Sequence, residues 1–133
     1  MSTFESKVTI PKPVGEVYNF LADMNNHQQL MPENIHDWVS TYDTASFNIQ
    51  NMAKLSLVVD SREINTEIKI IPSEKPPFNL ELKWSLSSKD DQTEILFTIF
   101  ADLNMMLKML ASGPLQKLAD HETSTLVSIF SKT

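Results

Sequence analysis

Residues 78–86, which read FNLELKWSL, alternate apolar and polar side chains. Successive side chains of a β-strand point to opposite faces of the sheet, so this alternation predicts a strand with one dry and one solvated face. A polar turn is expected at residues 87–92, and residues 93–103 predict a second strand whose apolar face runs from Ile95 to Ala101. The dry face of the first of these strands carries Phe78, Leu80, Leu82, Trp84 and Leu86.

The segment after these strands changes to helical spacing. Residues 104–130 predict one long helix, and Gly113-Pro114 is expected to kink or restart it, because proline lacks the backbone donor and its ring clashes with the preceding turn. At about 100° per residue, one apolar stripe lies along this helix. We expect that stripe to cover the dry faces of the strands. Its members after the proline are Leu115, Leu118, Ala119, Leu126, Ile129 and Phe130.

The beginning of the chain predicts one strand and two small helices. Residues 3–10 alternate in the manner of a half-buried strand. Pro13 suits the first turn of a short amphipathic helix that runs to about Asp23. Asn25 and Asn26 can cap a second short helix through Leu30.

From Ile35 onward the apolar residues again recur with a period of two, which predicts strands. Together with the three strands already named, they make an α+β chain with seven strands. Short hairpin connections are expected at residues 42–44 and 61–62. The four predicted strands cover residues 35–42, 45–51, 54–60 and 66–71.

The composition limits the class of protein. A chain of 133 residues with 41% hydrophobic and 21% charged residues has the size and composition of one globular domain. No apolar run approaches the roughly 20 residues that span a bilayer, so stable membrane insertion is not expected. The zero cysteine count, and residues 1–7 without the features of a secretory signal, predict a cytoplasmic protein.

Charge and residue spacing argue against several kinds of ligand. The net charge of -6, from 17 acids and 11 bases, opposes attraction to nucleic-acid phosphates. Only two glycines occur, so a GxGxxG or Walker loop cannot be built, and no cofactor is predicted. His27, His36 and His121 show no HxH or HExxH spacing, so no metal site is predicted and surface positions are expected for these histidines.

The order of these elements resembles the START-like, or Bet v 1-like, helix-grip superfamily, also called SRPBCC or the polyketide cyclase/dehydrase and lipid-transport superfamily. The resemblance covers essentially the whole chain, as one START-like domain at residues 1–133. Two groups of residues carry it: a strand-to-helix opening and the entry to the last helix of small bacterial members. They are Ile10-Pro11-Lys12-Pro13, Val17-Tyr18-Asn19-Phe20-Leu21-Ala22-Asp23 and Leu30-Met31-Pro32, then residues 101–109 (ADLNMMLKM) with Pro114-Leu115.

The resemblance implies a helix-grip fold, in which a seven-stranded curved antiparallel sheet wraps around a long, kinked C-terminal helix. Two short helices lie between the first and second strands. Members of the superfamily bind or transform apolar molecules between sheet and helix, and others serve as partner-binding modules.

Glu122 is the most informative residue, because it lies near the centre of the apolar helical stripe. Burying an unpaired carboxylate costs several kcal/mol, so Glu122 needs a partner, water in a cavity, or a raised pKa. Alternatively, the helix rolls by some tens of degrees or Glu122 is hydrated at an open end of the cavity. Conceivable partners are Arg62, His27, His36 and His121, and the sequence gives no distance to any of them.

The sequence predicts a ligand-binding site at the inward faces of the sheet and the helices. The same apolar residues would also suit a solid core, and methionines serve equally as adaptable pocket lining and as packing. Glu122 is the expected polar contact. The predicted ligand-binding residues are Phe20, Met24, Leu82, Trp84, Phe97, Met109, Leu118, Glu122 and Leu126.

Three functions remain open at this point. The first is the binding of a small hydrophobic or amphipathic molecule between sheet and helix. The second is a cyclase- or dehydrase-like enzyme, in which His36 or Tyr18 assists Glu122 in proton transfer; no G-x-S-x-G elbow occurs and no convincing catalytic set is present. The third is a protein-interaction module, including a homodimer, that uses residues 106–110.

Overall fold

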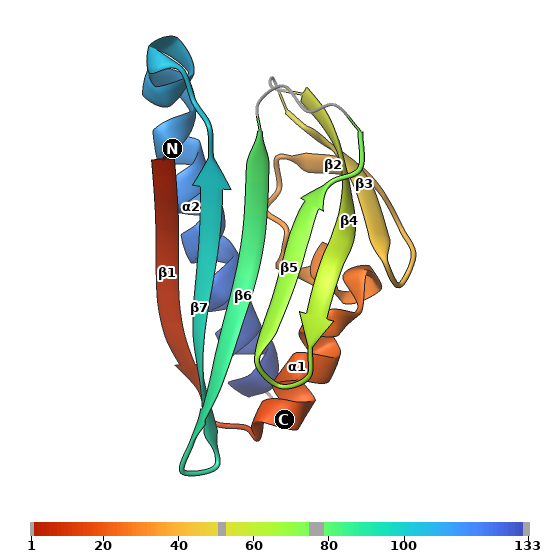
Figure 1. Cartoon of the computed structure of the whole chain (residues 1–133), viewed down its shortest axis with the longest axis vertical. Helices are drawn as coiled ribbons and strands as arrows, with labels where there is room; N and C mark the ends of the chain where they lie inside the picture. Colours follow the sequence, from red (N-terminus) through yellow and green to blue (C-terminus); the bar gives the residue numbers. More distant parts are fainter. Residues whose placement is uncertain (1, 51–52, 75–78, 132–133) are drawn as a thin grey trace.

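The computed structural model describes residues 2–50, 53–74 and 79–131. Within them, seven strands form one antiparallel sheet in the order β1-β7-β6-β5-β4-β3-β2 (Figure 1). The helices are α1 (Val14–Ala22), the 3₁₀ helix η1 (Met24–Leu30) and α2 (Met105–Ser131). The strands are β1 (Ser2–Ile10), β2 (Ile35–Ser40), β3 (Thr44–Ile49), β4 (Ala53–Glu63), β5 (Glu67–Pro72), β6 (Leu80–Lys89) and β7 (Gln92–Ala101).

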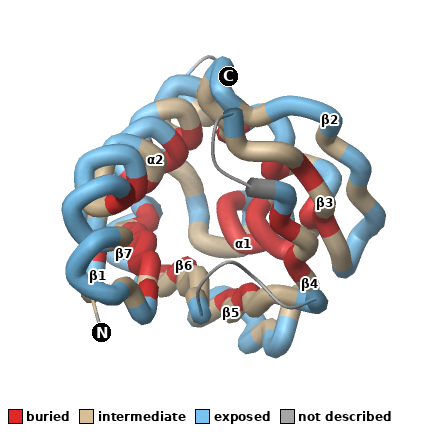
Figure 2. The backbone as a smooth tube through the Cα atoms, turned by 90° about the horizontal axis from the view of Figure 1, so that it is seen from above, coloured by how far each residue is buried: buried red, intermediate tan, exposed pale blue. Residues whose placement is uncertain are grey.

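The sheet bends into an open curve, with α1 inside the curve and α2 alongside β1 and β7 (Figure 2). This arrangement is the helix-grip fold that the sequence predicts. Buried residues line the inner face of the sheet and the side of α2 that faces it. Among the described helices, none is both long enough and apolar enough to cross a membrane.

The alternation in the two strands that decide the fold is confirmed. In the register of β6 and β7, Trp84 lies opposite Phe97 and Leu82 lies opposite Ile99. The rings of Trp84 and Phe97 stack with their centroids 4.0 Å apart, and both side chains are fully buried. Phe78, which the sequence adds to this face, lies outside the described residues.

Helix α2 is fixed to the first strand by two polar contacts. The hydroxyls of Ser6 and Thr123 are 2.7 Å apart, and the Gln116 side-chain amide donates to the carbonyl of Glu5 at 3.0 Å. Ala119 and Leu126 are fully buried on the same side of the helix. These contacts set the rotation of α2 and turn Glu122 inward.

One local prediction is wrong. Ser61 and Arg62 lie inside β4 and do not form a hairpin connection, because β4 stays paired with β5 as far as Glu63, with a shift of register between Val59 and Ser61. The turn comes later, at residues 64–66, where Asn65 takes a positive φ of 60°, a conformation that asparagine tolerates well. Of the two outcomes expected at Gly113-Pro114, a kink or a restart, the restart does not occur, because Pro114 lies inside the single helix α2.

Strand ends differ from the prediction by a few residues. β2 ends at Ser40 because the Thr41 side chain accepts from the backbone N–H of Thr44 and forms the turn to β3. β3 is described to Ile49, and the predicted end at residue 51 lies outside the described residues. β6 extends to Lys89 and meets β7 through a two-residue turn, Asp90-Asp91, in which both φ values are positive, at 51° and 67°.

Candidate ligand-binding site

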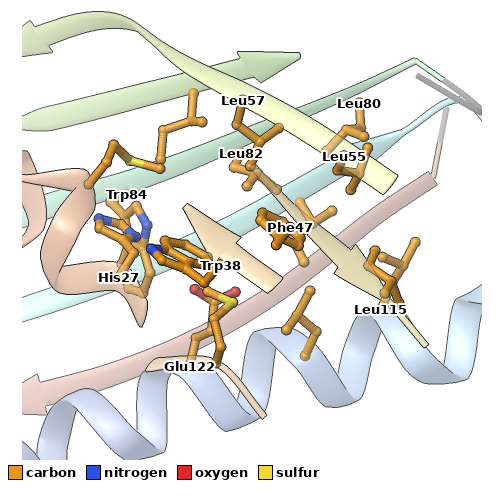
Figure 3. Close-up of a pocket in the computed structure, with 16 residues that line it drawn as sticks. His27, Trp38, Phe47, Leu55, Leu57, Leu80, Leu82, Trp84, Leu115 and Glu122 are labelled. Atoms are coloured by element: carbon orange, nitrogen blue, oxygen red, sulfur yellow. The ribbon is translucent and has the colours of Figure 1, made fainter. Parts of the chain in front are cut away.

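An apolar cavity lies between the inner face of the sheet, η1 and the middle of α2 (Figure 3). The volume of this cavity is about 50 Å³. Leu115, Leu118 and Glu122 face it from α2, since a spacing of three and four residues keeps side chains on one side of a helix. The other lining residues are Met24, His27, Met31, Trp38, Phe47, Ile49, Leu55, Leu57, Ile70, Leu80, Leu82, Trp84 and Ile99.

The two ends of this cavity differ in chemistry. His27, Trp38, Trp84 and Glu122 gather at one end in Figure 3, and leucines from β4, β6 and α2 line the other. All groups that can hydrogen-bond through a side-chain nitrogen or oxygen therefore lie together among the lining residues. We call these four residues the polar end of the cavity.

Glu122 is the carboxyl group of the polar end. It is 3% exposed, and the described residues give it no hydrogen bond or ion pair. Burial disfavours its charged form and raises the pKa of Glu122 to about 8. At pH 7 the side chain is therefore mainly a neutral carboxylic acid that can donate one hydrogen bond and accept others.

His27 is buried, which the sequence did not predict. Its Nε2 lies 2.7 Å from the carbonyl oxygen of Leu21. Burial lowers the pKa of His27, and the bond to Leu21 and the charge of Asp23 oppose the shift. A carbonyl oxygen can only accept, so Nε2 carries the proton of the neutral ring and Nδ1 is left as an acceptor.

The spacing within η1 contains a signal for this burial. A 3₁₀ helix has three residues per turn, so Met24, His27 and Leu30 lie on one side. All three are buried. The surface position predicted for His27 is therefore wrong, whereas His36 and His121 are exposed, as the sequence predicts.

Both tryptophans of the chain have a buried indole Nε1 with no hydrogen-bond partner among the described residues. The ring of Trp38 stacks on Phe47 with centroids 5.2 Å apart. The ring of Trp84 lies edge-on to His27 at 6.1 Å. Buried donors without partners are rare in folded proteins, which makes these two N–H groups part of the site's chemistry.

A second, wider pocket adjoins the cavity. It has a volume of about 360 Å³ and shares Ile49, Leu115 and Leu118 with the inner cavity. Its remaining lining residues come from the chain before and at the start of β2 and from the middle of α2. They are Pro32, Asn34, Ile35, Pro114 and Lys117.

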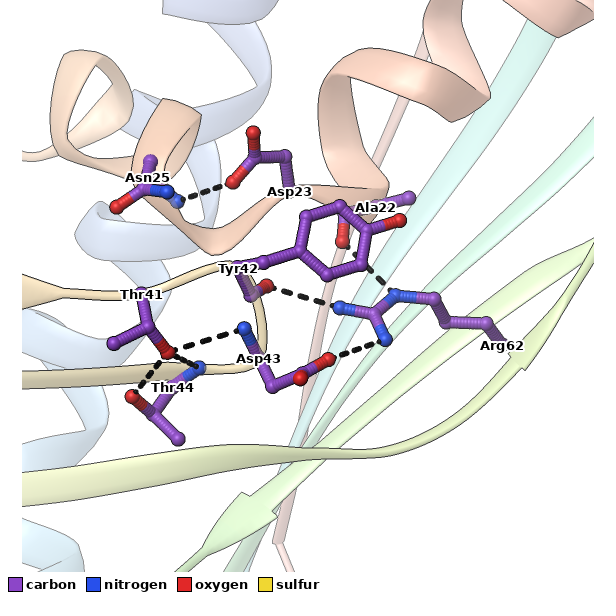
Figure 4. A network of polar contacts seen from close by, with 8 residues as sticks. All are labelled: Ala22, Asp23, Asn25, Thr41, Tyr42, Asp43, Thr44 and Arg62. Carbon is purple, nitrogen blue, oxygen red and sulfur yellow. Dashed lines mark hydrogen bonds and ion pairs between the residues drawn. The ribbon is translucent and has the colours of Figure 1, made fainter.

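Arg62 holds the segment that carries η1 in place (Figure 4). Its Nε donates to the carbonyl of Ala22 at 2.9 Å, and Nη2 donates to the carbonyl of Tyr42 at 3.0 Å. Its Nη1 forms an ion pair with Asp43 at 2.7 Å. Arg62 is thus engaged at the end of α1, immediately before η1, and is not a partner of Glu122.

Five predicted ligand-binding residues lie at the cavity: Met24, Leu82, Trp84, Leu118 and Glu122. The other four do not line it. Phe97 and Leu126 are fully buried behind it in the core, and Phe20 makes an edge-on ring contact with Phe130 at 5.5 Å. Met109 is 83% exposed and does not line the cavity. It lies about 200° around α2 from the fully buried Ala111 and therefore faces away from the core.

The structure does not bring the suggested acid-base set together. His36 is exposed on β2, and Tyr18, although buried in α1, does not line the cavity. Among the described residues, no three His, Cys, Asp or Glu side chains are placed to hold a metal ion. The chemistry that the site offers is apolar contact and hydrogen bonding.

Comparison with solved structures identifies the fold. The protein XoxI from Bacillus cereus is 9% identical, with a TM-score of 0.77, over 98% of this chain and 96% of that chain. A Thermobifida fusca protein is 13% identical, with a TM-score of 0.74, over 99% and 95%. A START superfamily protein from Mycobacterium smegmatis is 15% identical, with a TM-score of 0.70, over 98% and 97%.

These likenesses extend over nearly the whole of each chain and establish the helix-grip fold shared with a START superfamily protein. No protein-family model matches the sequence, and no protein of curated function matches it. Because one fold hosts many activities, function has to be argued from the site.

Proposed function

We propose that this protein binds a small apolar or amphipathic molecule between the sheet and α2. The observation that carries the proposal is an apolar, leucine-lined cavity with the buried Glu122 carboxyl at its wall. Ligand sites are usually concave and mostly apolar, with a few convergent polar groups and a residue of perturbed pKa. Several solved structures share this fold, one of them a START superfamily protein.

The volumes limit how a ligand could be held. Ligand sites of drug-sized molecules commonly measure about 300 to 1,000 Å³, so the inner cavity of about 50 Å³ is too small by itself. The adjoining pocket of about 360 Å³ is large enough. We propose that the ligand enters between the start of β2 and the middle of α2, with its polar group directed toward Glu122.

The flexible lining supports this reading of the inner cavity. Met24 and Met31 face it from η1 and the residue that follows. Methionine has three rotatable bonds and a polarizable sulfur, so it adapts to differently shaped apolar surfaces. Rotation of these side chains would enlarge the inner cavity without moving the sheet.

A fluorescence titration tests the proposal. N-phenyl-1-naphthylamine, a neutral probe that brightens in apolar surroundings, should bind the wild-type protein. Leu118→Trp places a larger ring where the two pockets meet and should weaken binding at least tenfold. Leu110→Trp is the matched control, because Leu110 is on the same helix and 68% exposed. Equal binding by both variants would place the probe elsewhere and count against the cavity.

A second candidate function is a protein-interaction module, and the surface at the start of α2 favours it. Met105, Met106, Met109 and Leu110 are 83%, 73%, 83% and 68% exposed. Clustered exposed apolar side chains often mark contact surfaces. If they join two copies of the chain, light scattering should detect a dimer that Met106→Lys disrupts; a monomer at every concentration would count against this.

A further inference from the structure

The polar end of the cavity contains buried hydrogen-bond donors that have no partner among the described residues. The indole N–H groups of Trp38 and Trp84 have no partner among the described residues. Glu122, protonated at neutral pH, adds an O–H donor at the same end. The acceptors there are the Nδ1 of His27 and the oxygens of Glu122, and neither indole is hydrogen-bonded to them.

We infer that the polar end of the cavity recognises a carbonyl oxygen on an otherwise apolar ligand. This inference rests on the proposed function and specifies its ligand class. A carbonyl oxygen accepts two hydrogen bonds and donates none. It therefore complements a site that contains unpartnered donors, here the two indole N–H groups. Leaving a buried donor unpaired is costly, which gives a ligand with an acceptor an advantage over a hydrocarbon of equal shape.

Charge selects a neutral carbonyl over a carboxylate. Among the described residues, no Lys or Arg lines the inner cavity, and Lys117 lines only the outer pocket. A carboxylate at the polar end would be buried without a cation, which is strongly unfavourable. Ketones, aldehydes and esters therefore match the site, with the apolar remainder of the ligand against the leucines of the other end.

The alternative occupant of the polar end is water. A single water molecule needs roughly 10–15 Å³, so the cavity of about 50 Å³ can hold one. Water that permanently satisfied both indoles would remove the advantage of a carbonyl. A pair of probes that differ only in that group separates the two cases.

The test compares benzophenone with diphenylmethane, in which a methylene group replaces the carbonyl. The chain has two tryptophans, so a ¹⁵N-labelled sample gives two indole N–H signals in the NMR spectrum. Benzophenone should bind about tenfold more tightly than diphenylmethane, the factor expected for one hydrogen bond. At least one indole proton should move downfield with benzophenone only.

Trp38→Phe removes one donor and keeps an aromatic ring, and it should bring the two affinities together. Trp38 is preferred to Trp84, which is fully buried against Phe97 and is needed for the core. Tyr42→Phe is the control, because Tyr42 is 51% exposed and does not line the cavity; it should leave the affinity ratio at the wild-type value.

The outcomes separate this inference from the proposed function. If both probes bind equally and neither indole proton moves downfield, the carbonyl inference is wrong and apolar binding stands. If neither probe perturbs the side chains that line the cavity, both the inference and the proposed function are wrong. The affinities of the two probes and the shifts of the indole protons are both measured on the wild-type protein. The conclusion therefore does not depend on whether Trp38→Phe folds.

Discussion

Glu122→Gln should abolish a specific dependence of stability on pH. The pKa of Glu122 is about 8 in the folded protein and 4.5 by its ordinary value. Between these values the folded state holds a proton that the unfolded state has released. The free energy of unfolding therefore falls as pH rises through this window, and the loss is complete once the folded carboxyl has ionised.

The interval from pH 6.5 to pH 9 isolates this effect. Below the ordinary His27 pKa of 6.5, His27 binds a proton in the unfolded state but stays neutral in the folded state. His27 therefore makes the protein less stable as pH falls, which is opposite to the effect of Glu122. Above pH 6.5, Glu122 is the one of these two residues whose titration changes the free energy of unfolding. At 1.36 kcal/mol per pKa unit, about 2 kcal/mol of stability should be lost between pH 6.5 and pH 9.

Urea unfolding at half-unit steps of pH measures this loss. The difference between wild type and Glu122→Gln cancels the titration of all other groups. That difference in the free energy of unfolding should change by about 2 kcal/mol across the interval. The variant should become more stable relative to the wild type as pH rises. Glu63→Gln, at an exposed position on β4, is the control and should run parallel to the wild type. If Glu122→Gln also runs parallel, Glu122 is not a buried neutral carboxyl.

Three further substitutions test the framework of the site by urea unfolding. Arg62→Met removes the donors to Ala22 and Tyr42 and the ion pair with Asp43, and should cost about 2 kcal/mol; a loss below about 0.5 kcal/mol would mean that this contact does not hold η1. Asn104→Ala removes the side chain that accepts from the N–H of Leu107 at 2.9 Å at the start of α2, and should cost about 1 kcal/mol, whereas Asn104→Asp should retain most of it. Leu126→Ala, at a fully buried position, should cost about 3 kcal/mol, and an exposed leucine changed in the same way, Leu110→Ala, should cost far less.

The parts of the fold that the sequence predicts are those with strong periodicity. The alternation in β6 and β7 and the 100° spacing in α2 determine which side chains face inward, and Glu122 is buried as the stripe predicts. Periodicity within one element carries this information because the backbone geometry of a strand or helix is nearly fixed. The order of the elements then leads to the helix-grip fold.

The misplaced residues depend on relations between elements, which periodicity does not contain. Met109 is an exception, because at about 100° per residue it lies about 180° around the helix from Leu118. The spacing itself places Met109 away from the stripe, and the residue is 83% exposed. Phe97 and Leu126 are fully buried, as the pattern predicts, but neither lines the cavity. The size of the cavity is likewise set by how side chains from strands β2 to β7, from η1 and from α2 pack together.

His27 was missed for a different reason. The residues around it, Asn25, Asn26, Gln28 and Gln29, are all polar, and the segment contains only two apolar side chains, Met24 and Leu30. Those two are six residues apart, which is two full turns of a 3₁₀ helix and places His27 midway between them. The period of three in this segment therefore indicates that His27 is buried.

Native mass spectrometry of the protein purified from its own source tests the central claim most directly. A complex that carries one small molecule per chain should survive gentle ionisation and release that molecule on activation, and Leu118→Trp prepared in the same way should carry none. A spectrum without any bound molecule in every preparation would contradict a binding site between the sheet and α2. A molecule that Leu118→Trp retains equally would contradict it as well.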